Sequence, residues 1–315
     1  MTPILRLLAP VCVGLALVMA ARCARPAGPP ADGRVAVWLD VSPAFDDPPR
    51  DPGDAFAIVQ AFGTERLRVR GVSTTFGNVP LVRGFPAARA LLEKLEGGAL
   101  RPWRGASSAE EREAPTEATE LLAEALDEAP LTIIAAGPAT TVASLLQRRP
   151  DLDARIDRLV RVGGLPDGTS ESAVDPHVAA DPESMQILLA REMAITLVPA
   201  DAAGLALEEA DLARLDAADS LVRQVAAGAR SWLTHTKTTL VAVPAMLAVD
   251  VVARPGTVRC EAATARLETP SGAPARLRVS GRPDPTGRRV SWCHTPDPGA
   301  RERILKDLLA VRSTR

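Results

Sequence analysis

The sequence predicts an α/β fold with a Rossmann-like, mainly parallel sheet that helices flank as a single domain. Short apolar runs, such as residues 35–40 and 131–136, have the length and composition of buried strands. Segments with helical periodicity lie between these runs, and strands that alternate with helices form βαβ units. A chain of 315 residues with 46% hydrophobic residues can bury a full core of this kind.

The elements can be placed along the chain from the same patterns. We expect strands at residues 35–40, 67–74, 131–136, 156–162, 194–198, 264–268, 276–279 and 289–293. We expect helices at residues 55–62, 85–95, 117–126 and 142–147, over most of 206–252, and at 301–311. One more helix begins after Asp181, which is a good N-cap and is followed by Pro182. We expect residues 165–180 to form a loop.

The overall charge argues against a nucleic-acid polymer as the partner. The net charge is −2, the pI is about 6.0, and aromatic residues make up only 3% of the chain. The chain also has no cluster of lysines and arginines. It therefore offers neither a basic surface for phosphates nor a series of aromatic platforms for bases.

The first 33 residues are typical of an exported protein. Residues 1–22 carry one early charge, Arg6, and then an apolar run that is the length of a signal-peptide core. Cys23 stands where a bacterial lipoprotein carries its lipidated cysteine, but Arg22 before it matches that motif poorly. Residues 23–33 are predicted to be a linker, and residues 34–315 the domain. We expect a periplasmic or extracellular protein, and a lipid anchor at Cys23 stays open.

Two cysteines lie in the predicted domain, Cys260 and Cys293. In an oxidising compartment they can form a disulfide, which would stabilise the fold by roughly 3 to 4 kcal/mol through loop closure. The alternative is two separate buried thiols. Neither cysteine has a CxxC partner, so the pattern does not favour a metal site.

Carboxylates crowd the end of the first predicted strand. That strand stops at Asp40, and four more acids follow before the next helix: Asp46, Asp47, Asp51 and Asp54. Ligands of open α/β sheets bind at the carboxyl ends of the strands, and crowded carboxylates there favour a cation such as Ca²⁺ or a polyol. The alternative is a solvated turn in which Asp54 only caps the helix.

Four segments together resemble the nucleoside hydrolase family of the inosine/uridine-preferring type. They are residues 40–43 with 54–55, residues 71–78, residues 131–141 with 162–164, and residues 175–183. Order and spacing agree over about residues 34–312. The resemblance implies a Rossmann-like domain, a homo-oligomer, and calcium-dependent hydrolysis of the N-glycosidic bond of a ribonucleoside.

The resemblance also implies roles for individual residues. The candidate metal ligands are Asp40, Asp54, which matches a bidentate calcium ligand, and Thr140, which would use its backbone carbonyl. Asn78 matches a ribose contact. Asp175 stands at the position of a ribose-binding acid, and His177 at that of a ribose-binding asparagine. For His177, an ordinary loop hydrogen bond is the alternative.

Several positions depart from the family pattern and predict a degenerate site. Ser42 replaces the aspartate that is both metal ligand and general base in the family, so no catalytic base is assigned. Pro244 and Ala245 stand where the family has a His-Asp pair. Fewer carboxylates bind calcium more weakly. Two hypotheses follow: an exported hydrolase with a remodelled site, or a non-catalytic member that binds a ribose-like ligand or a partner.

The acidic loop can be aligned with the family in two registers. Counting forward from Asp40 makes Asp46 and Asp47 the family's acid pair and residues 48–54 an insertion. Counting back from the helix makes residues 53–54 the pair, which leaves Asp54 as the acid. We favour the second register, because the apolar residues 55–58 define where the helix begins.

Overall fold

A computed structural model describes residues 32–46 and 48–314 of the chain. The predicted leader, Cys23 and Asp47 lie outside the described residues, as does most of the predicted linker. No helix within these two ranges is both long and apolar enough to cross a membrane.

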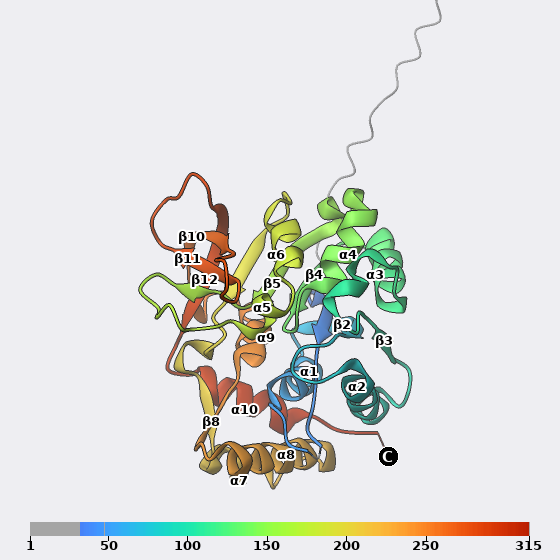
Figure 1. Ribbon diagram of the computed structural model, residues 1–315. Coiled ribbons are helices and arrows are strands. Elements are labelled where there is room, and N and C mark those ends of the chain that lie inside the picture. Colours follow the sequence, from blue (N-terminus) through green and yellow to red (C-terminus); the bar gives the residue numbers. More distant parts are fainter. Residues whose placement is uncertain (1–31, 47, 315) are drawn as a thin grey trace, which may run out of the picture.

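One large sheet forms the centre of the molecule (Figure 1). Its strands are β1 (Val35–Val41), β2 (Leu67–Thr74), β3 (Pro102–Arg104), β4 (Leu131–Ala135), β5 (Ile156–Val162), β6 (Leu165–Pro166), β7 (Ile195–Val198), β10 (Val258–Glu268), β11 (Arg276–Ser280) and β12 (Arg288–Pro296). Their order is β3-β2-β1-β4-β5-β7-β12-β10-β11-β6. Strands from β3 to β12 pair in parallel, and β10 pairs antiparallel with both neighbours. The predicted mainly parallel sheet is confirmed.

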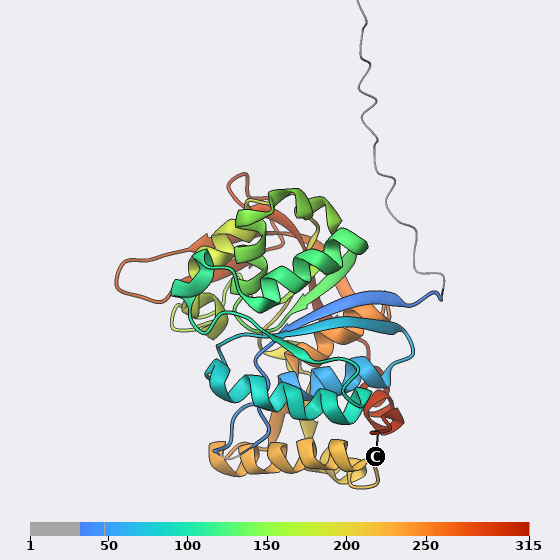
Figure 2. The same ribbon diagram turned by 90° about the vertical axis from the view of Figure 1, so that its right-hand side faces the viewer.

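Helices cover both faces of the sheet (Figure 2). The longer ones are α1 (Gly53–Gly63), α2 (Leu81–Glu96), α3 (Glu117–Glu128), α4 (Thr140–Arg148), α6 (Pro182–Leu189), α8 (Ser220–Thr236), α9 (Pro244–Ala253) and α10 (Ala300–Ala310). The shorter α5 (Pro176–Ala180) and α7 (Glu209–Leu215) complete the set. One apolar core lies between the sheet and α1, α2, α8, α9 and α10, and a second lies under α3, α4 and α6.

The first strand shows why the apolar runs are nearly continuous. Val37, Leu39 and Val41 point into the core that contains α1, and Trp38 points into the core on the opposite face. Because both faces are covered, every side chain of the strand must be compatible with burial. Asp40 lies on the same face as Trp38, since side chains alternate along a strand.

Three segments differ from the sequence expectation. Residues 165–180 are not a simple loop, because they contain β6 and α5. The helix α5 forms because the carboxylate of Asp175 accepts the backbone N–H groups of His177 and Val178. Residues 206–252 are mostly helical but include an antiparallel pair, β8 (Ala206–Glu208) and β9 (Leu240–Ala242). The short edge strand β3 carried no recognisable pattern.

The antiparallel part of the sheet carries the disulfide. Cys260 in β10 is the register partner of Cys293 in β12, and their sulfur atoms are bonded at 1.99 Å. This is the pair that the sequence suggested. The bond ties two neighbouring strands together at the end of the sheet away from β1.

Candidate active site

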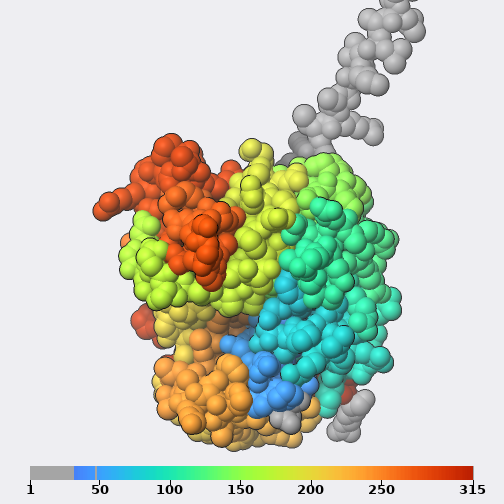
Figure 3. Space-filling view, viewed as in Figure 1, coloured from blue at the N-terminus to red at the C-terminus, as the bar shows by residue number. Residues whose placement is uncertain are grey.

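A cavity of about 420 Å³ lies at the carboxyl ends of β1, β2, β4 and β5. Its lining includes Asp51, Asp54, Asn78, His177, Trp232 and Ala245. Strand order reverses between β1 and β4, because β2 lies on one side of β1 and β4 on the other. Such a reversal is where open α/β sheets bind ligands. Figure 3 shows the loop after β1, in blue, beside the gold helix α8 on this face of the molecule.

Asp54 is the acid that α1 carries to the cavity. It lies in the first turn of the helix, where its Oδ2 accepts the backbone N–H of Ser42 at 2.7 Å. The N-cap of α1 is Pro52, so the alternative that Asp54 merely caps the helix is wrong. Burial raises the pKa of Asp54 to about 6, although the hydrogen bond from Ser42 lowers it. The carboxylate is therefore a stronger base than an exposed aspartate.

Asp51 brings a second carboxylate to the cavity from the loop that precedes α1. Its Oδ1 accepts the backbone N–H of Gly53 at 2.8 Å, and burial raises its pKa. A Cβ placed on Gly53 would lie 3.0 Å from the same Oδ1 atom. The carboxylate of Asp51 thus fills the space into which a side chain at position 53 would point.

Asn78 joins the end of β2 to this loop. Its Nδ2 donates to the backbone carbonyls of Asp51, at 2.8 Å, and Ser42, at 3.1 Å. Both amide hydrogens are therefore used within the protein, and the side-chain oxygen remains for a ligand in the cavity that Asn78 lines. The hydroxyl of Ser42 is fully buried and exchanges hydrogen bonds with the backbone of Val79. Ser42 does not line the cavity.

His177 lines the cavity from the first turn of α5. Burial, together with the positive charge of Arg161, lowers the pKa of His177 to about 4. The imidazole is therefore neutral at pH 7. It packs against Gly77, where a Cβ would lie 3.0 Å from His177 Nδ1 and 2.6 Å from Pro138 Cδ. Gly77 has a φ of +135°, so both space and backbone conformation require glycine there.

Two further predicted residues lie behind the cavity and use their polar atoms internally. Asp175 is fully buried, and besides capping α5 it accepts the backbone N–H of Gly164 at 2.9 Å. The hydroxyl of Thr140 donates to Asp181 at 2.6 Å, and Asp181 also accepts Arg112 at 2.8 Å. Neither Asp175 nor Thr140 is part of the cavity lining.

Asp40 belongs to a buried row that runs across the sheet. Ser73, Asp40, Ala135, Arg161 and Leu197 are register partners on β2, β1, β4, β5 and β7. The hydroxyl of Ser73 donates to Asp40 Oδ1 at 2.6 Å, and Oδ2 has no partner among the described residues. Burial raises the pKa of Asp40 to about 7. The side chain of Arg161 is completely buried.

No metal site is evident at the candidate metal ligands among the described residues. Asp54 lines the cavity, whereas Asp40 lies in the buried row and Thr140 is the first residue of α4. Ser42 and Ala245 stand at the positions where the resemblance expects aspartates. Within residues 32–46 and 48–314, no three His, Cys, Asp or Glu side chains are grouped closely enough to hold a metal ion. A buried guanidinium lies beside these acids, which further disfavours a dication.

The structure places the two alternative acid pairs differently. The carboxylate of Asp46 is exposed and forms an ion pair with Arg83 at 2.8 Å. Asp54 is at the helix start and in the cavity lining, as the register anchored on the helix predicts. Asp47 cannot be compared because it lies outside the described residues.

Sequence reasoning missed two residues of this region. Trp232 of α8 belongs to no motif of the sequence, but it lines the cavity. Arg161 was not singled out, although a charged residue in the middle of an apolar strand is a recognisable signal. Pro244 and Ala245, the positions where the resemblance expects a His-Asp pair, do line the cavity.

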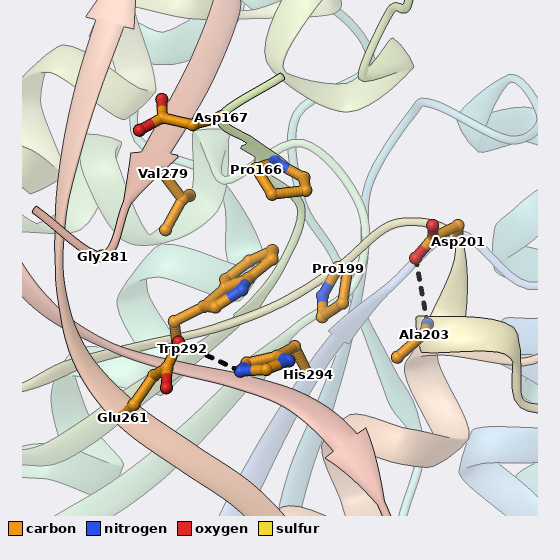
Figure 4. A pocket seen from close by; sticks show the side chains of 10 residues that line it. All are labelled: Pro166, Asp167, Pro199, Asp201, Ala203, Glu261, Val279, Gly281, Trp292 and His294. Atoms are coloured by element: carbon orange, nitrogen blue, oxygen red, sulfur yellow. Dashed lines mark hydrogen bonds and ion pairs between the residues drawn. The ribbon is translucent and has the colours of Figure 1, made fainter. Parts of the chain in front are cut away.

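A second cavity, of about 400 Å³, lies at the far part of the sheet (Figure 4). Its lining includes Asp167, Pro199, Asp201, Glu261, Trp292 and His294. His294 Nε2 lies 3.2 Å from Glu261, and the rings of Trp292 and His294 stack. None of the predicted site residues is among those that line it, so the first cavity is the candidate active site.

Solved structures of nucleoside hydrolases have this fold. A plant nucleoside hydrolase, PpNRh1, superimposes with a TM-score of 0.74 at 19% identity, over 87% of this chain and 98% of that one. An inosine-guanosine nucleoside hydrolase gives a TM-score of 0.74 at 18% identity, over 88% and 99% of the two chains. These similarities define the class of fold: a mainly parallel sheet between helices in one nucleoside-hydrolase-like domain.

The sequence comparison identifies the family. The profile of the inosine-uridine preferring nucleoside hydrolases matches residues 37–286, so this chain belongs to that family. A pyrimidine-specific ribonucleoside hydrolase, RihA of Salmonella typhimurium, is 30% identical over 181 residues, which are 48% of this chain and 58% of that protein. RihA of Escherichia coli O9:H4 is 29% identical over 193 residues, or 52% and 60% of the two chains. The chain therefore matches less than two thirds of the length of these relatives. The family is generally calcium-dependent.

Proposed function

We propose that this chain hydrolyses the N-glycosidic bond of a ribonucleoside in the cavity at the carboxyl ends of β1, β2, β4 and β5. The observation that carries the proposal is the pair of carboxylates, Asp51 and Asp54, that line a cavity of about 420 Å³ beside Asn78. That volume is within the usual range for small-molecule sites, about 300 to 1,000 Å³. Membership of the family and the ribonucleoside hydrolases among its relatives support the class of substrate.

Asp54 is the group we assign to the proton transfer. Glycoside hydrolysis passes through an oxocarbenium-like transition state, which nearby carboxylates stabilise. In this proposal, the bond from the ribose to the base breaks, and the base leaves with the bonding electrons. A water molecule adds its oxygen to the sugar carbon and gives a proton to Asp54. The proton then returns through solvent to the base. The raised pKa of Asp54 suits this task near neutral pH.

The other lining groups bind the two parts of the substrate. Asp51 and the free oxygen of Asn78 can accept hydrogen bonds from ribose hydroxyls. The indole of Trp232 offers a face on which a nucleobase can stack. His177 is neutral at pH 7 because burial lowers its pKa to about 4, so it is not the acid that protonates the base.

No step of this mechanism uses calcium. The family implies Ca²⁺, but the described residues hold no group of three His, Cys, Asp or Glu side chains close enough to bind a metal ion. The charge that stabilises the transition state is therefore assigned to Asp51 and Asp54. Hydrolysis measured with and without a chelator separates this proposal from a calcium-dependent reaction.

The decisive experiment uses the purified chain from residue 34 onward. It is incubated with uridine, cytidine, inosine and adenosine, and free base is measured by chromatography while binding is measured by calorimetry. Release of base from at least one nucleoside in the presence of chelator is expected. Binding without release would identify a non-catalytic member that only holds a ribonucleoside. Neither binding nor release would overturn the proposed substrate class.

We also propose that the protein is exported. The apolar segment in residues 1–22 and the disulfide between Cys260 and Cys293 support this location, because disulfides persist in oxidising compartments. Expression of the full chain in a bacterium, followed by fractionation and mass spectrometry, tests export and the lipid anchor at Cys23. Light scattering on the soluble domain tests the homo-oligomer that the family implies.

A further inference from the structure

The acids behind the cavity need a positive charge. Asp40, Asp175 and Asp181 are buried to 1% exposure or less, and they come from three different elements. Asp181 has Arg112 as an ion-pair partner. Asp40 and Asp175 have hydroxyl or backbone N–H donors but no ion pair within the hydrogen-bonding limit. Buried carboxylates of this kind are destabilising unless a cation compensates them.

Arg161 is placed to supply that cation. It stands two strands from Asp40 in the same register row, with Ala135 as the register partner between them. Neighbouring strands are about 4.8 Å apart, so the Cα atoms of Asp40 and Arg161 are roughly 10 Å apart, which a long arginine side chain can cover. On the other side, a Cβ placed on Gly163 would lie 2.5 Å from Asp175 Oδ2 and 3.6 Å from Arg161 Nη1. The guanidinium therefore lies near Asp175, and the charge of Asp40 also acts on it.

The hydrogen bonds of Arg161 leave most of its donors free for this role. Nη1 donates to the backbone carbonyls of Val162 and Ala135. Nε and Nη2 have no partner among the described residues, and neither has Asp40 Oδ2. These atoms of Asp40 and Arg161 belong to the same buried row, where the hydroxyl of Thr141 also acts on Asp40 and lowers its pKa. Burial lowers the pKa of Arg161, and the negative charges of Asp175, Asp40, Asp54 and Asp181 counteract that effect.

We propose that Arg161 is a built-in counter-cation for these acids, and that it takes the electrostatic role of the divalent ion that the family implies. The acids of this chain are then held in place without metal. A dication entering the cluster would meet the guanidinium at close range and find Asp54 Oδ2 and both oxygens of Asp175 already hydrogen-bonded. This inference does not depend on the proposed hydrolysis, because it concerns charge and stability in the protein alone.

The first test measures calcium on the unaltered domain. Calorimetric titration with CaCl₂ is expected to give no binding heat, and millimolar calcium or chelator should leave the Tm unchanged. Calcium binding with one site per chain would overturn the proposal. No substrate is present, so this result is independent of whether the chain hydrolyses nucleosides.

The second test removes the charge. Arg161→Met is expected to lower the Tm by about 10 °C, because it leaves buried carboxylates unpaired. Calcium should then raise the Tm of this variant, which it does not do for the unaltered domain. Arg158→Met is the matched control, because Arg158 is a partly buried residue of the same strand with no ion pair among the described residues. Equal Tm values for the two variants would overturn the proposal.

A third variant keeps the test possible if Arg161→Met does not fold. Arg161→Lys keeps the positive charge at nearly the same place, so it should fold and remain insensitive to calcium. Loss of folding in both Arg161 variants would mean that the shape of the side chain matters rather than its charge, and would contradict the proposal.

Discussion

The cavity end of the sheet and its antiparallel end handle charge in opposite ways. At the cavity, Asp40 and Arg161 are completely buried, and each has polar atoms without a partner. At the antiparallel end, Arg276 and Arg278 form ion pairs with Glu171, whose side chain is 82% exposed. Charge effects are large where water is excluded and small where it is present. The difference teaches that the buried charges near the cavity affect pKa values and stability most, although ion pairs are more numerous elsewhere.

The largest expected effect comes from the acid in the first turn of α1. Asp54→Asn should reduce base release by about 10² to 10⁴-fold, because it removes the proton acceptor. The measurement is kcat/KM on the best nucleoside. Asp46→Asn is the matched control, because Asp46 is exposed and pairs with Arg83 outside the cavity. Similar losses in both variants would contradict the assignment.

The pH profile sharpens the same assignment. Since burial raises the pKa of Asp54 to about 6, its carboxylate is protonated and inactive below that pH and becomes active above it. We expect kcat/KM to rise with pH through about 6 and then to level. A profile still rising tenfold per unit above pH 7 would point to a different base.

The disulfide at the antiparallel end should affect stability and not chemistry. A double change, Cys260→Ser with Cys293→Ser, removes a loop closed over a separation of 33 residues. The chain-entropy relation then predicts a loss of roughly 3 to 4 kcal/mol in the free energy of unfolding. Chemical denaturation measures it. A change in nucleoside affinity below the unfolding transition would show that the two ends of the sheet are coupled.

Stacking on α8 should contribute a moderate amount of binding. Trp232→Ala should weaken nucleoside binding by about 1 to 3 kcal/mol, the usual contribution of one base stacked on an aromatic ring. Calorimetry with uridine and with ribose alone separates the contributions, because ribose has no base to stack. Equal losses for both ligands would place Trp232 against the sugar instead.

The smallest effect is expected at the exposed ion pairs. Glu171→Gln removes an acceptor shared by Arg276 and Arg278, yet the change in unfolding free energy should stay below about 1 kcal/mol. Thermal unfolding measures it. A larger loss would show that these arginines, which are themselves buried, depend on Glu171 as strongly as the cavity acids depend on their cation.

Much of this architecture was predictable from local patterns. The apolar runs at β1, β4 and β5 indicate strands covered on both faces, and the acids after β1 indicate a ligand site at their carboxyl ends. The early start of α2 was harder to predict. That helix begins at Leu81 although Pro86 lies inside it, and proline usually interrupts a helix.

The sequence by itself determined the class of fold and the family, because these depend on periodicity and on residue identity in order along the chain. Only the tertiary structure decided which charges meet. It brought Asp51 into the space beside Gly53 and placed Arg161 in one row with Asp40. The first pair of residues meets across a loop and the second across strands. Strand register and burial decide such contacts, and neither can be read from the order of residues along the chain.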